Sequence, residues 1–274
     1  MIPKEVFHYT KATTALENIL FEGKLKIGQF KDTNDPKERG QYFLDSFLNF
    51  PSNAGDQEFA NLYTKLTDVA TRIRNNEWKV LCFSKNHLDL DSGRVSFDEN
   101  PFLSGGCLPG MWAHYAENHR GVCLKFNGSK LNVQIQTSLL AEECTVCSGD
   151  VVYDNQKILD GPNSFFDMDN IHNLNDTEIE EKLKEYFIQY HERIFLVKSK
   201  DWENENEFRW LVYSKKDSPE FIPITNVLEE VFVGSDFSEA YYPSLIKFCK
   251  ELGIPSSKII WNNGVPYKKS ITQP

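Results

Sequence analysis

The 274-residue sequence lacks long hydrophobic runs, an excess of positive charge and the glycine-rich loops that bind phosphates in many nucleotide-dependent enzymes. No stretch approaches the roughly 18 apolar residues of a membrane-spanning helix. Residues 1–10 contain no basic segment followed by a long apolar run, so they do not resemble a signal peptide. We therefore expect a cytoplasmic protein that does not contact a membrane.

The chain has 40 acidic and 30 basic side chains, and its formal net charge is −10. This charge repels the phosphates of a nucleic acid duplex and opposes charge-driven binding. We therefore do not expect duplex DNA as a partner. A local basic channel for single-stranded RNA is still compatible with this composition.

The six cysteines are scattered along the chain, and their spacing indicates neither a disulfide framework nor a metal centre. Without a secretion signal, reduced thiols are the default in a chain of this length. Cys144 and Cys147 could form a redox pair or half of a zinc site, but no second pair or H-x-x-x-H accompanies them. In a strand the two thiols would point to opposite faces, so we predict inert cysteines and no bound metal.

Aromatic residues are abundant, with 20 phenylalanines, 11 tyrosines and 5 tryptophans. Each buried ring removes a large apolar area from water, so the sequence can form a substantial core. No repeat, low-complexity tract or linker-like segment divides the chain. We therefore predict a single domain over residues 1–274.

Helical spacing of apolar residues predicts four main helices. Two of them begin with capping boxes, which Thr14 forms with Glu17 and Thr177 forms with Glu180. Gly23 stands where a left-handed residue would end the first helix. The other two helices are expected over 56–75 and 238–252.

Short apolar or alternating segments predict the strands. They cover 1–9, 25–30, 79–84, 121–126, 144–153, 208–213, 230–234 and 259–261. Because several strands are adjacent in sequence while helices separate others, the pattern favours an α+β fold over a regular parallel α/β sheet. A long polar loop is expected over 88–110.

Two segments combine aromatic and polar side chains near the ends of predicted elements. Phe7–Thr10 (F-H-Y-T) lies at a strand exit, where polar groups could contact a ligand, but a half-buried strand end explains it better on spacing alone. Met111–Tyr115 (M-W-A-H-Y) could stack on a planar ring beside a flexible loop. A short amphipathic helix with aromatic core residues is an equally good interpretation of the second segment.

Glu203, Glu205 and Glu207 alternate into a predicted strand, so all three are expected on one face. Like charges on one face repel, and a close pair often has one raised pKa, which suits acid or base catalysis. The structural alternative is a solvated strand entrance with Arg209 as the neutralising partner, and composition alone favours it.

Several motifs together resemble a large bacterial family that is catalogued as a domain of unknown function. They are N-D-P at 34–36, C-F-S at 82–84, M-W-A-H-Y at 111–115, G-V-C-L-K-F at 121–126, W-x-x-E-x-E-F-R at 202–209 and E-V-F-V-G at 230–234. The resemblance covers nearly the whole chain. The layout of this family is in turn similar to the ADP-ribosyltransferase superfamily, whose split β-sheet core grips NAD.

The similarity implies an ADP-ribosyltransferase-like split sheet with flanking helices, and a set of residues that bind NAD. His8 and Thr10 match the H-x-T of the first core strand, where the backbone of His8 would bind the nicotinamide amide. Tyr115 would stack on the nicotinamide ring, although Tyr9 and Trp112 compete for this role. A clear S-T-S motif is missing, so the middle of the site is not assigned.

The same similarity implies two catalytic carboxylates. Glu207 matches the glutamate at the start of a late strand, and it would hold the ribose and face the cation that forms when nicotinamide leaves. Glu205 would orient or deprotonate the acceptor. No metal is needed for this chemistry.

The resemblance therefore predicts transfer of ADP-ribose from NAD, which is the substrate, to a macromolecular acceptor, either RNA or protein. Similar bacterial transferases are toxins or phage-defence effectors, so an antitoxin protein is a possible partner. One alternative is an NAD glycohydrolase, in which water is the acceptor. A second alternative is a non-catalytic module that binds a nucleotide or a partner in the same cleft.

Overall fold

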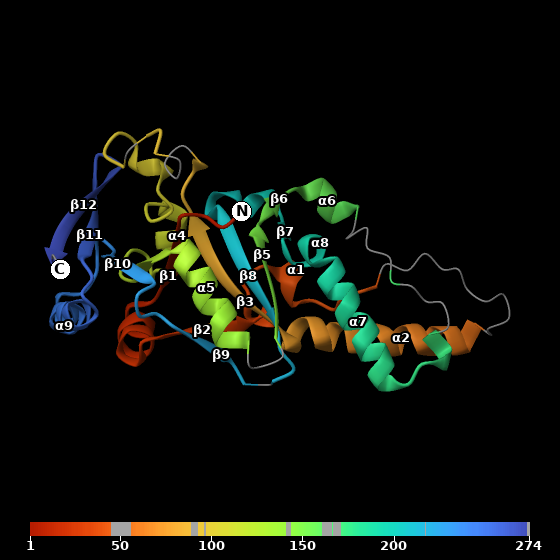
Figure 1. Cartoon of the computed structure of the whole chain (residues 1–274). Helices are drawn as coiled ribbons and strands as arrows, with labels where there is room; N and C mark the ends of the chain where they lie inside the picture. The colour runs from red at the N-terminus through yellow and green to blue at the C-terminus, as the bar shows by residue number, and fades with distance from the viewer. Residues whose placement is uncertain are drawn as a thin grey trace.

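The computed structural model describes residues 1–44, 56–88, 93–95, 97–140, 144–160, 166, 171–216 and 218–272. These residues form a mixed α+β fold around one open sheet (Figure 1). The sheet has ten strands, and every strand pairing within it is antiparallel except that of β10 with β11. The predicted fold class is therefore confirmed at this level.

The sheet order is β12-β11-β10-β4-β1-β3-β2-β9, and β8 pairs with both β3 and β5. The strands are β1 (Glu5–Thr10), β2 (Lys24–Gln29), β3 (Trp78–Lys85), β4 (Val122–Asn127), β5 (Thr145–Asp150), β8 (Glu207–Tyr213), β9 (Glu220–Pro223), β10 (Leu228–Val233), β11 (Ser256–Asn262) and β12 (Val265–Thr272). Two short strands, β6 (Val152–Tyr153) and β7 (Val197–Lys198), form a separate parallel pair.

The sheet divides at β3. One edge of β3 pairs with β8 over residues 78–84. The other edge pairs with β1 near its C-terminal end, where Phe7 faces Ser84, and with β2 near its N-terminal end, where Gly28 faces Val80. The part of this edge at residues 81–83 therefore lies between β1 and β2, and we call it the fork.

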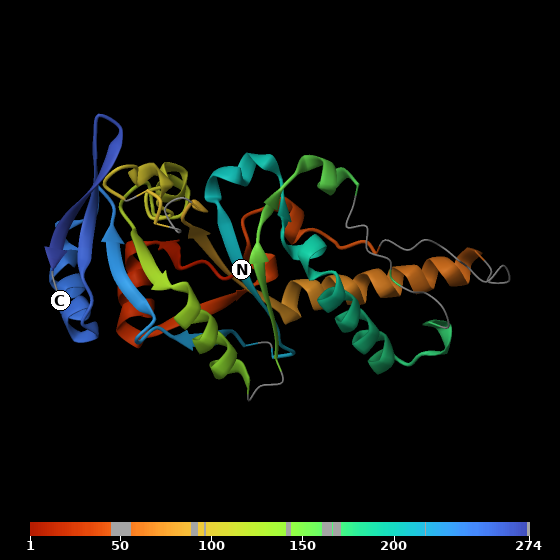
Figure 2. The ribbon, with the colours of Figure 1, turned by 45° about the horizontal axis from the view of Figure 1, so that its top comes forward.

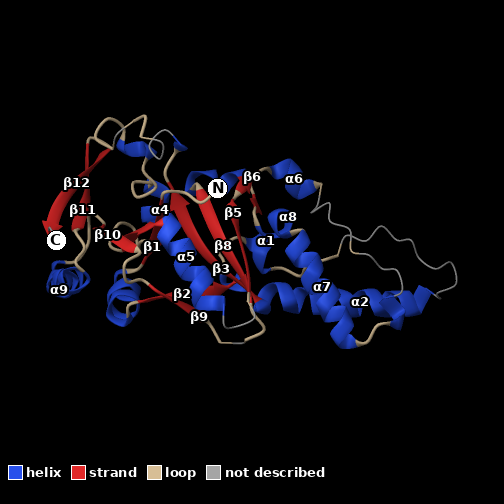
Figure 3. Ribbon diagram, viewed as in Figure 1, coloured by secondary structure: helices blue, strands red, loops and turns tan. Residues whose placement is uncertain are grey.

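Helices cover both faces of the sheet, and α2 and α7 lie side by side beyond its end (Figures 2 and 3). The helices are α1 (Pro36–Arg39), α2 (Asp56–Arg72), α4 (Pro109–His114), α5 (Gly128–Leu139), α6 (Asn155–Leu159), α7 (Asp176–Gln189), α8 (His191–Phe195) and α9 (Tyr242–Leu252). Two π-helices are η1 (Thr14–Leu20) and η3 (Ile73–Glu77). The short 3₁₀ helices are η2 (Phe30–Asp32), η4 (Pro101–Leu103), η6 (Ile171–Asn173), η7 (Lys200–Glu205) and η8 (Glu239–Tyr241).

Alternation along the strands separates two apolar clusters. Leu81 and Phe83 of β3 pack with η1, α5 and α9 on one face, whereas Val80 packs with α2, α7 and α8 on the other. Cys144 and Cys147 also pack against different clusters, as predicted for two thiols on opposite faces of a strand. No disulfide joins any of the six cysteines. The sheet thus has a core on each side, with the fork at its centre.

Both predicted capping boxes are wrong. At the first helix Thr13 is already helical and no side chain caps locally, because the carboxylate of Glu117 accepts from the backbone N–H of Ala12 at 3.1 Å. At α7 the capping box is formed two residues earlier, by Asn175 and Glu178. The start of the first helix is therefore fixed by a long-range contact with Glu117, and the start of α7 is fixed by Asn175, which is a better N-cap residue than threonine.

The predicted left-handed end at Gly23 is confirmed, with φ of 65°, and Gly253 ends α9 in the same way, with φ of 66°. Helix α5 and strands β9 and β12 were not predicted. The predicted loop over 88–110 lies partly outside the described residues; within them it contains η4 and the start of α4.

Candidate functional site

A cavity of about 320 Å³ opens at the fork. This volume falls at the lower end of the range for small-molecule sites, about 300–1,000 Å³. Its walls come from β1, β2, β3 and β8, from the 32–34 segment, and from residues of α4, β7 and η7 or next to them. The division of the sheet therefore creates a site that four strands of the sheet and four other segments share.

His8 lies in this cavity with one ring nitrogen already engaged. Its Nδ1 lies 3.2 Å from the carbonyl oxygen of Cys82, so Nδ1 holds the hydrogen and donates it. Burial lowers the pKa of His8, although the Cys82 contact opposes this change. The imidazole is therefore neutral at pH 7, and its Nε2 is an acceptor.

Of the other predicted NAD-binding residues in this region, Tyr9 lines the cavity and Thr10 and Trp112 do not. The Tyr9 hydroxyl donates to the carbonyl oxygen of Gly105 at 2.7 Å. Trp112 is fully buried, donates its indole N–H to Gly106 at 3.0 Å and packs edge-on against Tyr9. Trp112 therefore belongs to the core that supports the site.

Tyr115 follows α4 and lines the cavity. Its hydroxyl donates to Oε1 of Glu205 at 2.5 Å. Burial, together with the nearby charge of Glu205, raises the pKa of Tyr115 well above its usual value. Tyr115 is thus a neutral donor, and among the three competing aromatic residues it is the one that joins the cavity to a carboxylate.

The three glutamates do not alternate along one strand face, so that prediction is wrong. Glu205 ends the η7 turn, Asn206 adopts a left-handed conformation with φ of 45°, and β8 begins at Glu207. Glu203 is exposed, whereas Glu205 and Glu207 are buried and both line the cavity. The turn at Asn206 therefore brings together only two of the three carboxylates.

Lys198 is the residue of this site that the sequence did not reveal. Its Nζ lies 2.7 Å from Oε2 of Glu205 and 3.1 Å from Oε2 of Glu207. It ends β7, directly after the apolar run 194–197. A lysine at the end of a buried apolar run was the available signal, because a buried ammonium group needs acidic partners.

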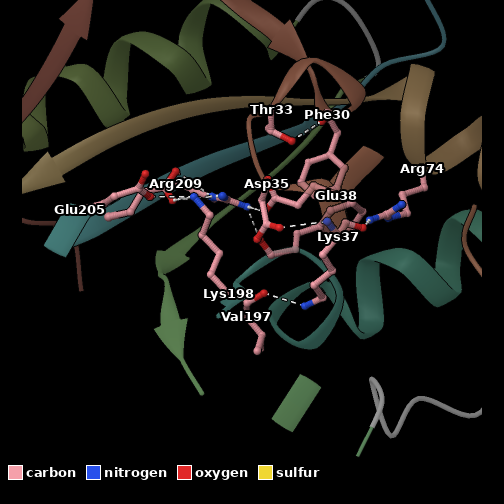
Figure 4. Close-up of polar contacts among 12 residues, drawn as sticks. Phe30, Thr33, Asp35, Lys37, Glu38, Arg74, Val197, Lys198, Glu205 and Arg209 are labelled. Carbon is pink, nitrogen blue, oxygen red and sulfur yellow. Dashed lines mark hydrogen bonds and ion pairs between the residues drawn. The ribbon is translucent and has the colours of Figure 1, made fainter. Parts of the chain in front are cut away.

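Arg209 neutralises the site from the side of β8. Its Nε and Nη2 contact the two oxygens of Glu207 at 2.9 and 3.0 Å, and its Nη1 contacts Glu38 at 2.6 Å and the carbonyl oxygen of Phe195 at 2.7 Å. Figure 4 shows Arg209 between Glu205 and the segment that contains Asp35 and Glu38. The prediction that Arg209 neutralises the glutamates is therefore confirmed for Glu207, but this ion pair is buried and not solvated as expected.

The N-D-P motif positions Glu38 for this network. Asp35 accepts from the backbone N–H of Lys37 at 2.9 Å, and Pro36 occupies the first turn of α1. Lys37 in turn donates to the carbonyl oxygen of Val197 at 2.7 Å. Asp35, Lys37 and Glu38 thus join α1 to β7 and β8 (Figure 4).

The two carboxylates differ in their electrostatic environment. Burial opposes ionisation of Glu207, but the charges of Arg209 and Lys198 outweigh burial and lower its pKa to about 2. Burial raises the pKa of Glu205, and the opposing charge of Lys198 does not fully compensate. Carboxyl groups whose pKa values are pushed apart suit different roles in one reaction.

The charged side chains that line the cavity balance in number. Lys26, Lys198 and Arg209 are positive, and Asp32, Glu205 and Glu207 are negative when ionised. Glu38, which pairs with Arg209, does not line the cavity. Stabilisation of a developing positive charge would therefore depend on where the Glu207 carboxylate lies, not on the net charge of the cavity.

The comparison with protein families gives one match. A family model described as "Protein of unknown function (DUF2971)" matches residues 111–210. This segment of the chain is similar to that family, and it contains Tyr115, Lys198, Glu205, Glu207 and Arg209. No curated protein and no solved structure matches the chain.

Two kinds of feature are absent from the described residues. No helix there is both long and apolar enough to cross a bilayer. In the same part of the chain, no three or more His, Cys, Asp or Glu side chains are grouped so that they could hold a metal ion.

Proposed function

We propose that this chain is an ADP-ribosyltransferase that uses NAD as substrate and modifies a macromolecule, either RNA or protein. The observation that supports it most directly is the meeting of His8 and Tyr9 of β1 with Glu205 and Glu207 in one cavity at the fork. These two pairs lie about 200 positions apart in the sequence. In the ADP-ribosyltransferase superfamily a split sheet grips NAD between groups of these types, and the fork is the corresponding division in this chain.

The reaction begins when the bond between the ribose C1′ and the nicotinamide nitrogen breaks. The electron pair leaves with nicotinamide, and positive charge develops on the ribose. Glu207 is ionised at neutral pH because its pKa is about 2, so its negative charge is present before the reaction.

Transfer ends when a nucleophilic atom of the acceptor forms a bond to C1′ and gives up its proton. Glu205 is the group that receives this proton, because its raised pKa makes it a better base than an ordinary carboxylate. Glu205 lines the cavity beside Tyr115, so an acceptor bound there could reach it. The acceptor's proton therefore goes to Oε1 or Oε2 of Glu205.

Recognition of NAD uses the remaining cavity residues. Tyr115 offers a ring for stacking on nicotinamide, and His8 is neutral, so it does not repel the positive ring of NAD. The resemblance of the motifs to toxin-like bacterial transferases extends the proposal to a cytoplasmic toxin or phage-defence effector. An antitoxin protein would restrain it.

One observation favours a second candidate, a non-catalytic module that binds a nucleotide. Both oxygens of Glu207 contact Arg209, and one of them also contacts Lys198. A carboxylate whose oxygens are already occupied is a typical structural ion pair. Such a module would bind NAD or a related nucleotide at the fork without cleaving it.

Nicotinamide release from NAD by the purified chain, with and without cell lysate, tests the proposal. Glu207→Gln should reduce release by on the order of 10²-fold or more, because it removes the charge that faces the ribose cation. Glu203→Gln is the matched control, since Glu203 is exposed four residues earlier in the chain. Thermal unfolding of each variant shows that it is folded.

The outcomes separate the candidates. Release that needs lysate and is lost in Glu207→Gln supports the transferase, and equal release without lysate supports a glycohydrolase. Binding of NAD without release supports the non-catalytic module. No binding and no release by the folded wild-type chain would rule out NAD as the ligand of this cavity.

A further inference from the structure

A single buried ammonium group joins the parts of this site. The side chain of Lys198 is 5% exposed, and its Nζ contacts Glu205 and Glu207 at 2.7 and 3.1 Å. The same nitrogen lies 5.2 Å from the centre of the Trp202 ring, within the range of a cation–π contact. Lys198 therefore touches one carboxylate of β8 and two side chains of the η7 turn.

Lys198 is held in place independently of η7. Its backbone belongs to β7, which pairs with β6, and its carbonyl oxygen accepts from the N–H of Asp154 at 3.0 Å. Lys37 anchors the preceding residue, Val197, through its carbonyl oxygen. The ammonium group thus extends from a fixed strand to the turn that carries Glu205.

The position of Glu205 depends on side-chain contacts. Asn206 interrupts the strand geometry, so regular alternation does not place the Glu205 carboxylate near that of Glu207. Two buried carboxylates repel each other strongly where the dielectric is low. In the structure the attraction of Lys198 for both overcomes this repulsion, and Tyr115 supplies the other contact of Glu205.

We propose that Lys198 is a positioning residue, which holds Glu205 beside Glu207 for the transfer reaction. This inference rests on the proposed function, and it assigns the residue that makes two carboxylates from different elements work as a pair. Without the ammonium group, Glu205 would be free to move away from Glu207 and toward solvent. The base would then be misplaced while the cavity remained.

The first test compares Lys198→Met, Lys198→Arg and Lys200→Met in nicotinamide release over a range of pH. Lys198→Met removes the charge, and kcat should fall by on the order of 10²-fold, because a misplaced catalytic group has effects of this size. The acid limb of the pH profile should move up by about one unit or more, since a nearby positive charge no longer favours ionised Glu205. Lys198→Arg keeps the positive charge, so its kcat and the acid limb of its pH profile should stay close to those of the wild-type chain. Lys200→Met is the control, because Lys200 is exposed, and it should change neither kcat nor the pH profile.

A second test does not depend on activity. The Glu205 carboxyl is titrated by ¹³C NMR in the wild-type chain and in the three lysine variants, with its signal assigned from Glu205→Gln. The midpoint should rise in Lys198→Met and stay near the wild-type value in Lys200→Met. An unchanged midpoint in folded Lys198→Met would overturn the role of Lys198, whether or not the wild-type chain releases nicotinamide.

A double variant covers the case in which Lys198→Met does not fold. Removal of one partner from a buried charge cluster is strongly destabilising, and Lys198→Met/Glu205→Gln removes an acidic partner together with the lysine. If Lys198 acts through Glu205, the double variant should have the same kcat as Glu205→Gln alone. A further large loss of kcat in the double variant would show that Lys198 acts independently of Glu205 and would overturn the proposal.

Failure of the proposed function would give a result that can be distinguished from failure of the Lys198 proposal. A wild-type chain that neither binds NAD nor releases nicotinamide would overturn the transferase, while the Glu205 titration would still support or overturn Lys198 as the residue that pairs the carboxylates.

Discussion

At the scale of the residue, Tyr115 has two functions that can be separated. Its side chain lines the cavity, and its hydroxyl donates to Oε1 of Glu205 at 2.5 Å. Tyr115→Phe keeps the ring and removes the donor, so NAD should still bind with a similar KM. The lost hydrogen bond lowers the pKa of Glu205 in the wild-type chain, so we expect that pKa to rise. Because the hydroxyl no longer holds the Glu205 carboxylate in place, kcat should fall about tenfold, which corresponds to about 1.4 kcal/mol.

Steady-state kinetics of nicotinamide release check this prediction, with Tyr115→Ala as the comparison that also removes the ring. Tyr115→Ala should raise KM in addition to lowering kcat. Equal KM values for the two variants would argue against stacking by Tyr115. An unchanged kcat in Tyr115→Phe would argue against a role for its hydroxyl.

The sequence predicted the residues of the site unevenly. Glu205 and Glu207 were expected to lie close together, and they do, although the expected reason was strand alternation and the actual reason is a left-handed Asn206. Lys198 and Glu38 were not predicted, because they reach the carboxylates only through tertiary packing. The close pairing of Arg209 with Glu207, two residues away on one strand face, is local and was therefore predictable.

At the scale of the element, Gly121 fixes how the segment after α4 enters β4. A Cβ at this position would lie 2.4 Å from the carbonyl oxygen of Thr10 and 2.8 Å from Cα of Ala116. Gly121→Ala should therefore lower the free energy of unfolding by about 1–3 kcal/mol, the usual cost of overpacking. Gly110→Ala is the control, because a Cβ at Gly110 meets no atom within 4 Å.

Urea unfolding of the two glycine variants measures this difference. Gly110→Ala should unfold at nearly the wild-type urea concentration, whereas the midpoint for Gly121→Ala should be clearly lower. Equal midpoints for both variants would contradict the close approach of Gly121 to β1. The result also bears on the site, since Tyr115 lies between these two glycines in the sequence.

Elements with strong local signals were predicted, and elements defined by their neighbours were not. The predicted strand at 79–84 and the helix at 56–75 have clear apolar patterns, and both are present as β3 and as α2 continued by η3. Helix α5 could have been found from its cap, because Asn127 accepts from the backbone N–H of Lys130 at 3.0 Å. Strand β12 is largely exposed and is defined by its pairing with β11, so its sequence gives little signal.

At the scale of the whole molecule, Glu207 links folding stability to pH. Its pKa is about 2 in the folded chain and near 4.5 in the absence of interactions. A lowered pKa stabilises the fold at pH values above about 4.5, and this contribution disappears as the pH falls toward 2. The difference in free energy of unfolding between wild type and Glu207→Gln should therefore be about 3 kcal/mol at pH 7 and should shrink in acid.

Denaturant unfolding at a series of pH values measures this difference. Glu203→Gln should follow the wild-type curve at every pH, because its side chain is exposed. A gap between wild type and Glu207→Gln that stays constant from pH 7 to pH 3 would contradict the buried ion pair with Arg209.

The division of the sheet at β3 also determines when the cavity can first form during synthesis. The cavity needs β1, which ends at Thr10, and β8, whose Arg209 lies 199 positions later in the chain. A ribosome adds about 5–20 residues per second, so the N-terminal wall of the cavity waits on the order of ten seconds or more for the wall that β8 supplies. A nascent chain that has not reached β8 would therefore have no cleft to fill, and any activity of this cleft would begin only after β8 has been synthesised.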